Sequence, residues 1–136
     1  MFDAIGTAGT GMQTWHTWLD VISENIANVN DETPANGQVF RTHYMQAAAN
    51  NDMGGDGAGT GVHVASLSQS SENGQLVQDP TDPLANADGF VRRSNIDLSQ
   101  QMGDMIMAQR AFQANASTVG RAKDAYEAAI NIGKGI

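Results

Sequence analysis

Three histidines are the residues of this sequence best suited to acid–base or metal chemistry, yet each stands in a different segment. None of His16, His43 and His63 has a second ligand residue at the spacing of a metal site. An isolated histidine is usually structural or solvent-exposed. The sequence therefore predicts no metal site around these residues.

A glycine-rich stretch and several aspartates could also suggest chemistry. Gly54–Gly61 resembles a phosphate-binding loop in composition, but no Gly-Lys-Ser/Thr follows it and its flanks are acidic, which favours a linker. The spacing of Asp79, Asp82 and Asp88 does not match a calcium loop, and Asp-Pro turns explain these residues better. No serine is paired with a general base. We predict no catalytic residue, no cofactor and no enzyme activity.

Composition and charge exclude further classes of function. The chain has 136 residues and a net charge of −8, which disfavours nucleic acid and anionic membrane surfaces as partners. There is no cysteine, and hence no disulfide or thiolate chemistry. Met1–Gly6 lacks the basic and apolar regions of a signal peptide, and His16, Asp20 and Glu24 argue against a membrane-spanning helix. We expect a protein that does not insert into membranes and is not processed by signal cleavage.

The elements that could position a functional surface are two helices at the ends of the chain. Apolar residues repeat at alternating spacings of three and four in the N-terminal segment, which predicts one apolar stripe along a helix. Its members are Ile5, Ala8, Met12, Trp15, Leu19, Ile22, Ile26 and Val29. A similar C-terminal stripe comprises Leu98, Met102, Met105, Phe112, Ala116, Val119, Tyr126 and Ile130.

The predicted ends of the two helices divide the chain into segments 1–30, 31–93 and 94–136. The first helix should end near Asn28, and either Ser94 or Asn95 should cap the last helix, which should run to about Ile132. Between them we predict a tight turn at Asn36-Gly37, a flexible loop over residues 50–61, and turns around residues 79–83. Short strands are predicted at Gln38–Gln46, Val62–Leu67 and Gly74–Val77.

Both helices carry apolar residues outside their stripes. Trp18 and Val21 should lie beside the first stripe, and Ile106 and Met107 should point away from the second. Because two paired helices bury one stripe each, this extra apolar surface needs another cover. Either the central strands or neighbouring subunits of a polymer could supply it.

Several motifs resemble those of bacterial flagellar basal-body rod proteins. In the N-terminal half they are Asn25-Ile-Ala-Asn28 and the stretch Thr33–Arg41. The C-terminal half is more specific: Asp79-Pro80, Asp88-Gly-Phe-Val91, Asn95-Ile-Asp97 and Met105–Asn115 are similar to a proximal rod protein. The resemblance is poor over residues 47–75. The motif residues are Asn25, Ala27, Asn28, Gln109, Arg110, Ala111, Phe112, Ala114 and Asn115.

This resemblance implies an α+β fold in which the terminal helices pair as an antiparallel coiled coil, with a small irregular β region between them. It implies a structural subunit that polymerises into the periplasm-spanning rod and transmits torque from the membrane ring to the hook. The partners would be other rod subunits, further copies of the chain, and the flagellar type III export apparatus. The assembly core would comprise Ile5, Met12, Trp15, Leu19, Ile22, Ile26, Val29, Met102, Met105, Phe112, Val119, Tyr126 and Ile130.

Two alternatives remain at this point. The chain could be another paralogue of the rod and hook proteins, which share the motif around Phe112 in similar form. It could also be a helical-hairpin binding protein unrelated to flagella. That class would need a short turn between its helices, whereas a long segment separates them here.

Overall fold

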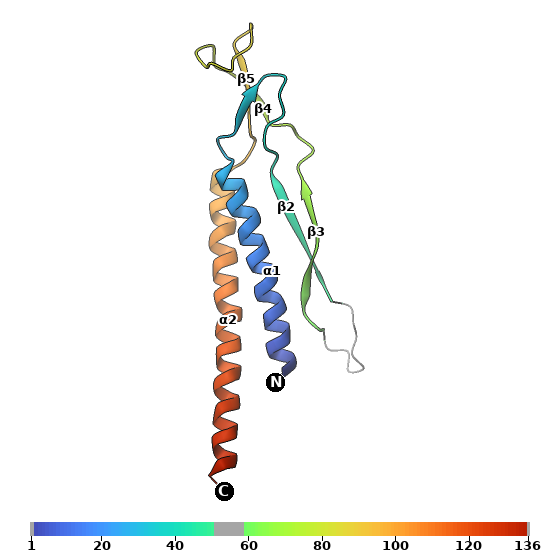
Figure 1. Cartoon of the computed structure of the whole chain (residues 1–136), viewed down its shortest axis with the longest axis vertical. Coiled ribbons are helices and arrows are strands. Elements are labelled where there is room, and N and C mark those ends of the chain that lie inside the picture. The colour runs from blue at the N-terminus through green and yellow to red at the C-terminus, as the bar shows by residue number, and fades with distance from the viewer. Residues whose placement is uncertain (1, 51–58, 136) are drawn as a thin grey trace. The chain divides into compact units, whose positions relative to one another are not determined.

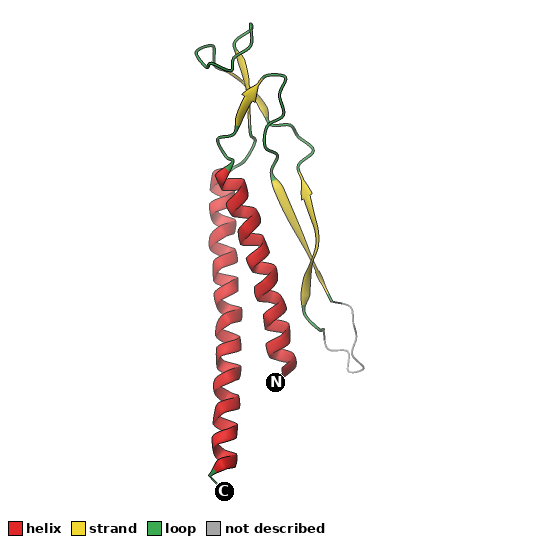
Figure 2. Cartoon of the chain, in the orientation of Figure 1, coloured by secondary structure: helices red, strands yellow, loops and turns green. Residues whose placement is uncertain are grey.

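The computed structural model describes residues 2–50 and 59–135, in which two long helices stand at the ends of the chain and five short strands lie between them (Figures 1 and 2). Two compact units share these elements. One comprises residues 1–19, 46–66 and 106–136, and the other comprises residues 20–45 and 67–105. Within each unit the two helices pack together, and the strands between them form small antiparallel sheets. The expected α+β class is confirmed.

Helix α1 (Phe2–Ala27) carries the N-terminal apolar stripe. It ends as expected because the Asn28 side chain turns back and donates to the carbonyl oxygen of Glu24 at 2.8 Å. Such a bond satisfies a carbonyl group that the helix end would otherwise leave unpaired. Val29, the last member of the predicted stripe, lies just beyond the helix.

Helix α2 (Leu98–Lys134) begins at a cap that differs from the predicted one. Asp97 is the N-cap, since its Oδ1 accepts from the backbone N–H groups of Ser99 at 2.8 Å and Gln100 at 3.1 Å. Ser94 is instead buried and donates its hydroxyl to the Val29 carbonyl oxygen at 3.1 Å. The prediction of Ser94 or Asn95 as the cap was wrong, because the Ser94 hydroxyl instead joins the segment before α2 to the segment after α1.

A three-stranded antiparallel sheet with strand order β1–β5–β4 lies in the second unit. Its strands are β1 (Glu32–Pro34), β4 (Gln75–Gln78) and β5 (Phe90–Arg93). The completely buried Val91 in the central strand pairs with Pro34 on one side and Val77 on the other. Of these three strands, only β4 was predicted from the sequence. Pro34 is compatible with β1 because β1 is an edge strand of the sheet.

The other sheet is a hairpin of β2 (His43–Ala49) and β3 (Val62–Gln69). The predicted strand Gln38–Gln46 starts later, at His43, because side chains bind the backbone before it. Asn73 accepts from Val39 N–H at 3.1 Å, and Asp31 accepts from Phe40 N–H at 2.6 Å. Neither β2 nor β3 contains Asp, Glu, Lys or Arg, and most of their side chains are exposed.

The loop end of this hairpin is bonded to α1 in the first unit. The Thr10 hydroxyl oxygen accepts from Val62 N–H at 3.1 Å, and the Asn50 N–H donates to the Gly61 carbonyl oxygen at 2.9 Å. Of the predicted loop 50–61, residues 51–58 lie outside the described residues. The two bonds fix where that loop leaves and rejoins the hairpin.

Gly74 offers a test of the sheet in the second unit. Its φ is +62°, and a Cβ atom there would overlap the Arg93 carbonyl oxygen. Gly74→Ala should therefore lower the free energy of unfolding by about 1–3 kcal/mol, measured by urea denaturation followed by circular dichroism. Gly103→Ala, in the interior of α2 with open space around it, should instead raise that free energy by up to about 1 kcal/mol. Equal stability of the two variants would contradict the assigned backbone.

Candidate functional site

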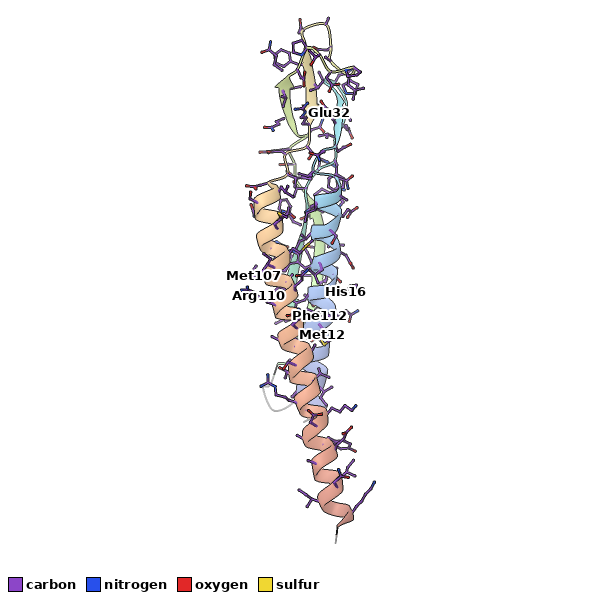
Figure 3. The ribbon with its side chains drawn as sticks, turned by 90° about the vertical axis from the view of Figure 1, so that its left-hand side faces the viewer. Met12, His16, Glu32, Met107, Arg110 and Phe112 are labelled. Carbon is purple, nitrogen blue, oxygen red and sulfur yellow. The ribbon has the colours of Figure 1, made fainter. Side chains whose placement is uncertain are left out.

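The histidines and carboxylates of the described residues are dispersed and take part in local hydrogen bonds. Within residues 2–50 and 59–135, no three His, Cys, Asp or Glu side chains come together in a way that could hold a metal ion. His16 is an exposed residue of α1 (Figure 3). His63 is also exposed, and its Nδ1 lies 2.6 Å from the Asn50 side-chain oxygen.

His43 belongs to a chain of side-chain hydrogen bonds at the start of β2. Its Nδ1 lies 3.0 Å from a Glu24 carboxylate oxygen, and its Nε2 lies 2.8 Å from the Gln69 amide nitrogen. The Gln69 oxygen in turn accepts from Arg41 at 2.7 Å. All these groups are satisfied if the neutral imidazole donates to Glu24 and accepts from Gln69. These hydrogen bonds support a role for His43 in orienting β2.

The aspartates of the β4–β5 connection act within turns, as predicted from the Asp-Pro sequences. Asp82 accepts from the Leu84 N–H at 2.7 Å. The Asp79 carboxylate accepts from the Thr81 hydroxyl at 2.8 Å and pairs with Arg93 at 3.2 Å. The Thr81 hydroxyl, together with Arg93, lowers the pKa of Asp79 below its ordinary value of 3.8. Hydrogen bonding and charge attraction from Glu32 raise the pKa of Arg93.

The most densely bonded polar group is the side chain of Asn25, which joins three elements of the second unit. It is only 1% exposed. Its oxygen accepts from His43 N–H at 2.8 Å, and its nitrogen donates to the His43 carbonyl oxygen at 2.9 Å. The same nitrogen donates to the Gln101 side-chain oxygen at 3.0 Å. The amide thus pairs with the backbone at the start of β2, as a neighbouring strand would, and also holds α1 to α2.

In the first unit the two helices approach each other at a glycine. A Cβ atom at Gly11 would lie 3.1 Å from the Asn115 amide nitrogen, which is tighter than ordinary van der Waals contact. Gly11 is buried, and so are the small neighbours Ala8 and Ala108. Small side chains let helix backbones come close, so this half of the helix contact depends on small residues.

The proposed assembly-core residues differ in burial within the single chain. Ile22 is buried, and most of the others are half-buried: Ile5, Met12, Trp15, Leu19, Ile26, Val29, Met105, Phe112 and Val119. Three are exposed: Met102, Tyr126 and Ile130. Whether these residues meet a neighbouring subunit stays a prediction.

The residues of the family motif likewise occupy different environments. Asn25 is buried, while Asn28, Ala111, Phe112 and Asn115 are half-buried. Ala27, Gln109, Arg110 and Ala114 are exposed. Only part of the motif therefore serves the fold of the single chain.

Sequence periodicity missed several residues that α1 and α2 bury. Val21, expected beside the stripe, is buried, as are Thr14, Gln101 and Ala108. A search for large apolar residues passes over Thr14, Gln101 and Ala108, because polar and small side chains occupy these helix positions. The spacing of three between Ala8 and Gly11 was a signal that could have indicated close helix approach.

Large apolar side chains of α2 stay uncovered in the single chain. Ile106 is 52% exposed and Met107 is 50% exposed, similar to the stripe residue Met102 at 56%. In Figure 3, Met107 and Arg110 extend from α2 on the side away from α1. The described strands do not cover Ile106 or Met107.

Comparison with known proteins agrees with these features. The family described as "Flagellar basal body rod FlgEFG protein C-terminal" matches residues 87–132, which contain β5 and nearly all of α2. A flagellar basal-body rod protein FlgC of Borreliella burgdorferi is 33% identical, with 99% of each chain covered. The FlgC proteins of Bacillus subtilis and Salmonella typhimurium are 30% and 31% identical, covering 98% and 93% of each chain respectively.

The rod-type C-terminal segment and the full-length similarity to rod proteins place the chain in the class of flagellar basal-body rod proteins. The full-length similarity narrows this class, and the chain belongs to the FlgC family. That family is one of structural rod proteins and is not known as a family of enzymes.

The Asn25 junction can be tested by removing its amide. Asn25→Ala should lower the free energy of unfolding by at least about 2 kcal/mol, because each buried polar group left unpaired costs about 1–3 kcal/mol. Gln109→Ala, at an exposed motif position, should change it by less than about 0.5 kcal/mol. Urea denaturation of the two variants beside the unchanged protein provides the measurement. A stable Asn25→Ala variant would show that the junction does not hold the fold.

Proposed function

We propose that this protein is a structural subunit of the bacterial flagellar basal-body rod, which polymerises through its terminal helices and transmits torque from the membrane ring to the hook. The observation that carries this proposal is the similarity to FlgC rod proteins over almost the whole chain. The exposed apolar residues of α2 give it a physical basis, because burying them would favour assembly. At roughly 25 cal/mol per Å², a few hundred Å² buried at each contact contributes several kcal/mol.

The terminal helices pair, in this proposal, as one antiparallel coiled coil. Each unit supplies one supporting contact: Gly11 with Asn115 in the first, and Asn25 with Gln101 in the second. A step of fourteen residues forward along α1 thus corresponds to a step of fourteen residues backward along α2. Buried and half-buried residues also recur at spacings of three and four: Ala8, Gly11, Trp15, Trp18, Ile22 and Asn25 on α1, and Gln101, Met105, Ala108, Phe112, Asn115 and Val119 on α2.

The proposed location is the periplasm-spanning rod of the basal body, reached through the flagellar type III export apparatus without cleavage. The proposed partners are other rod subunits and further copies of the chain. Nucleic acid and lipid are not among them, given the net charge of −8. Neither described helix has a stretch long and apolar enough to cross a membrane.

A deletion strain tests the proposal directly. Basal bodies isolated from cells lacking this protein should have no rod, whereas basal bodies from complemented cells should have one. Loss of the whole rod would indicate a proximal component. Loss of only the distal part would favour another paralogue of the family, and an intact rod would contradict the proposed function.

Ile26 provides a test at the level of one residue. It is half-buried beside the Asn25 junction, and we expect a neighbouring subunit to complete its cover. Ile26→Asp would then bury an unpaired carboxylate, at a cost on the order of several kcal/mol, and cells should be non-motile without a rod. Gln13→Asp, at an exposed position of the same helix, should leave swimming unchanged. Normal swimming of the Ile26→Asp strain would remove this residue from the assembly core.

Export without cleavage makes a prediction about the mature chain. Gly6, Gly9 and Gly11 each weaken the start of α1 by about 1 kcal/mol relative to Ala, so this segment can be threaded before assembly and ordered after it. Intact-mass measurement of the protein from isolated rods should find residues 1–12 attached, apart from removal of Met1. A mature chain that begins at or after Trp15 would show that a leader is cleaved.

A further inference from the structure

The tripeptide Asn-Gly-Gln occurs twice in this chain, at residues 36–38 and 73–75, and these are the only Asn-Gly pairs in the sequence. Both belong to the second unit. The first lies in the turn that follows β1, and the second leads into β4. Because the two tripeptides are identical, any difference in their chemistry within the folded protein comes from their surroundings.

An Asn-Gly pair can undergo a covalent reaction without an enzyme. The backbone nitrogen of the glycine attacks Cγ of the asparagine and forms a C–N bond, which closes a succinimide ring. The C–N bond of the side-chain amide breaks, and the amide nitrogen leaves as ammonia with the proton of the glycine N–H. Water then opens the ring at either carbonyl group and gives aspartate or isoaspartate. Glycine favours ring closure because it has no Cβ atom to obstruct the approach.

Asn36 stands where this reaction can occur. It is exposed, in a turn next to the edge strand β1. Backbone groups hold the turn: Gly37 N–H donates to the Pro34 carbonyl oxygen at 2.7 Å, and Arg92 donates to the Ala35 carbonyl oxygen at 3.0 Å. Since both acceptors are backbone atoms, rotation of the Asn36 amide breaks neither bond.

The fold itself accounts for the glycine at position 37. A Cβ atom there would lie 2.8 Å from Thr33 Oγ1 and 2.9 Å from Thr33 Cβ. Contacts this short are closer than van der Waals distance, so a larger residue would displace the turn. The turn thus keeps a reactive Asn-Gly pair at an exposed position.

Asn73, in contrast, is half-buried and held at both atoms of its amide. Its Oδ1 accepts from Val39 N–H at 3.1 Å, and its Nδ2 donates to the Gly37 carbonyl oxygen at 3.1 Å. Turning this amide toward the nitrogen of Gly74 would break both bonds. The loss of two hydrogen bonds of ordinary strength slows ring closure by about tenfold or more.

We propose that Asn36 is a site of spontaneous deamidation and isoaspartate formation in the folded protein, and that the two side-chain hydrogen bonds of Asn73 protect the second Asn-Gly pair. The overall reaction consumes only water and releases ammonia. The converted fraction therefore rises with the age of each chain. Every conversion adds one negative charge to the net charge of −8.

The isoaspartate product changes the turn. It routes the main chain through the former side chain, which lengthens the backbone between β1 and Gly37. The Gly37 carbonyl oxygen, to which Asn73 donates, then moves. Conversion at position 36 therefore loosens one of the two bonds that protect Asn73.

Incubation of the purified full-length chain at mildly alkaline pH tests the proposal, because the attacking nitrogen must lose its proton. Samples taken over time would be digested, and mass spectrometry with fragmentation would measure conversion at positions 36 and 73. In the folded protein Asn36 should react about tenfold faster than Asn73 or more. In guanidinium chloride the two rates should become similar, because both sites have the same Asn-Gly-Gln sequence.

Asn36→Gln provides the matched control, since the longer side chain closes a ring far more slowly. This variant should lose the fast reaction of the folded protein, and Asn73 should react no faster in it than in the unchanged chain. A faster reaction of Asn73 in the variant would contradict its protection by Val39 and Gly37 alone.

Two results with the unchanged chain would overturn the proposal. Similar rates at positions 36 and 73 in the folded protein would show that the hydrogen bonds of Asn73 give no protection. An Asn36 that reacts in guanidinium chloride but not in the folded protein would show that the turn after β1 prevents ring closure.

Discussion

The amide of Asn25 is the interaction on which the second unit depends, because it joins α1, the start of β2 and α2 at one buried point. A carboxamide can donate and accept together, so a single side chain pairs with both backbone groups of His43 and still reaches Gln101. An apolar residue of equal size would leave those groups unpaired at a site that is only 1% exposed. Buried polar contacts of this kind are a well-attested means of fixing helix register. The Asn-Ile-Ala-Asn motif thus has a structural role at its first residue, and at its last, Asn28, where the side chain ends α1.

Away from this junction, the described part of the chain buries few large apolar side chains. Ala8, Gly11 and Ala108 form much of the helix contact in the first unit, and they provide close approach but little apolar area. Since hydrophobic stabilisation scales with apolar area removed from water, the helices gain modestly from each other alone. Met102, Ile106 and Met107 stay exposed. In the proposed assembly, burial of these side chains would add to the stabilisation of each subunit.

Periodicity predicted the two helices because alternation by three and four is carried by large apolar residues such as Trp15, Ile22 and Phe112. It did not predict which residues face the partner helix, because Asn25 and Gln101 are polar and Ala108 is small. The strands were harder to predict from the sequence. β5 (Phe90–Arg93) is short and follows a turn, and β1 contains Pro34, so neither shows an alternating pattern.

Side-chain bonds over longer sequence distances explain the other differences. The strand predicted from Gln38 begins only at His43, because Asn73 and Asp31 occupy the backbone N–H groups of Val39 and Phe40. Ser94 has the sequence context of a helix cap, but it bonds to the distant Val29 carbonyl, which leaves the cap to Asp97. Local patterns cannot reveal such partners. The motif resemblance succeeded because it draws on positions such as Asn25 and Asn115, which tertiary contacts fix.

The hairpin of β2 and β3 has a consequence for the protein before it is incorporated. Strands whose edges lack lysine, glutamate or proline are templates for pairing with another chain, and this hairpin has none of these residues. The overall net charge of −8 opposes such pairing between free chains. Repulsion of this kind weakens as salt shortens the screening length to about 8 Å at physiological ionic strength. We therefore expect free subunits to associate through this hairpin more readily as ionic strength rises.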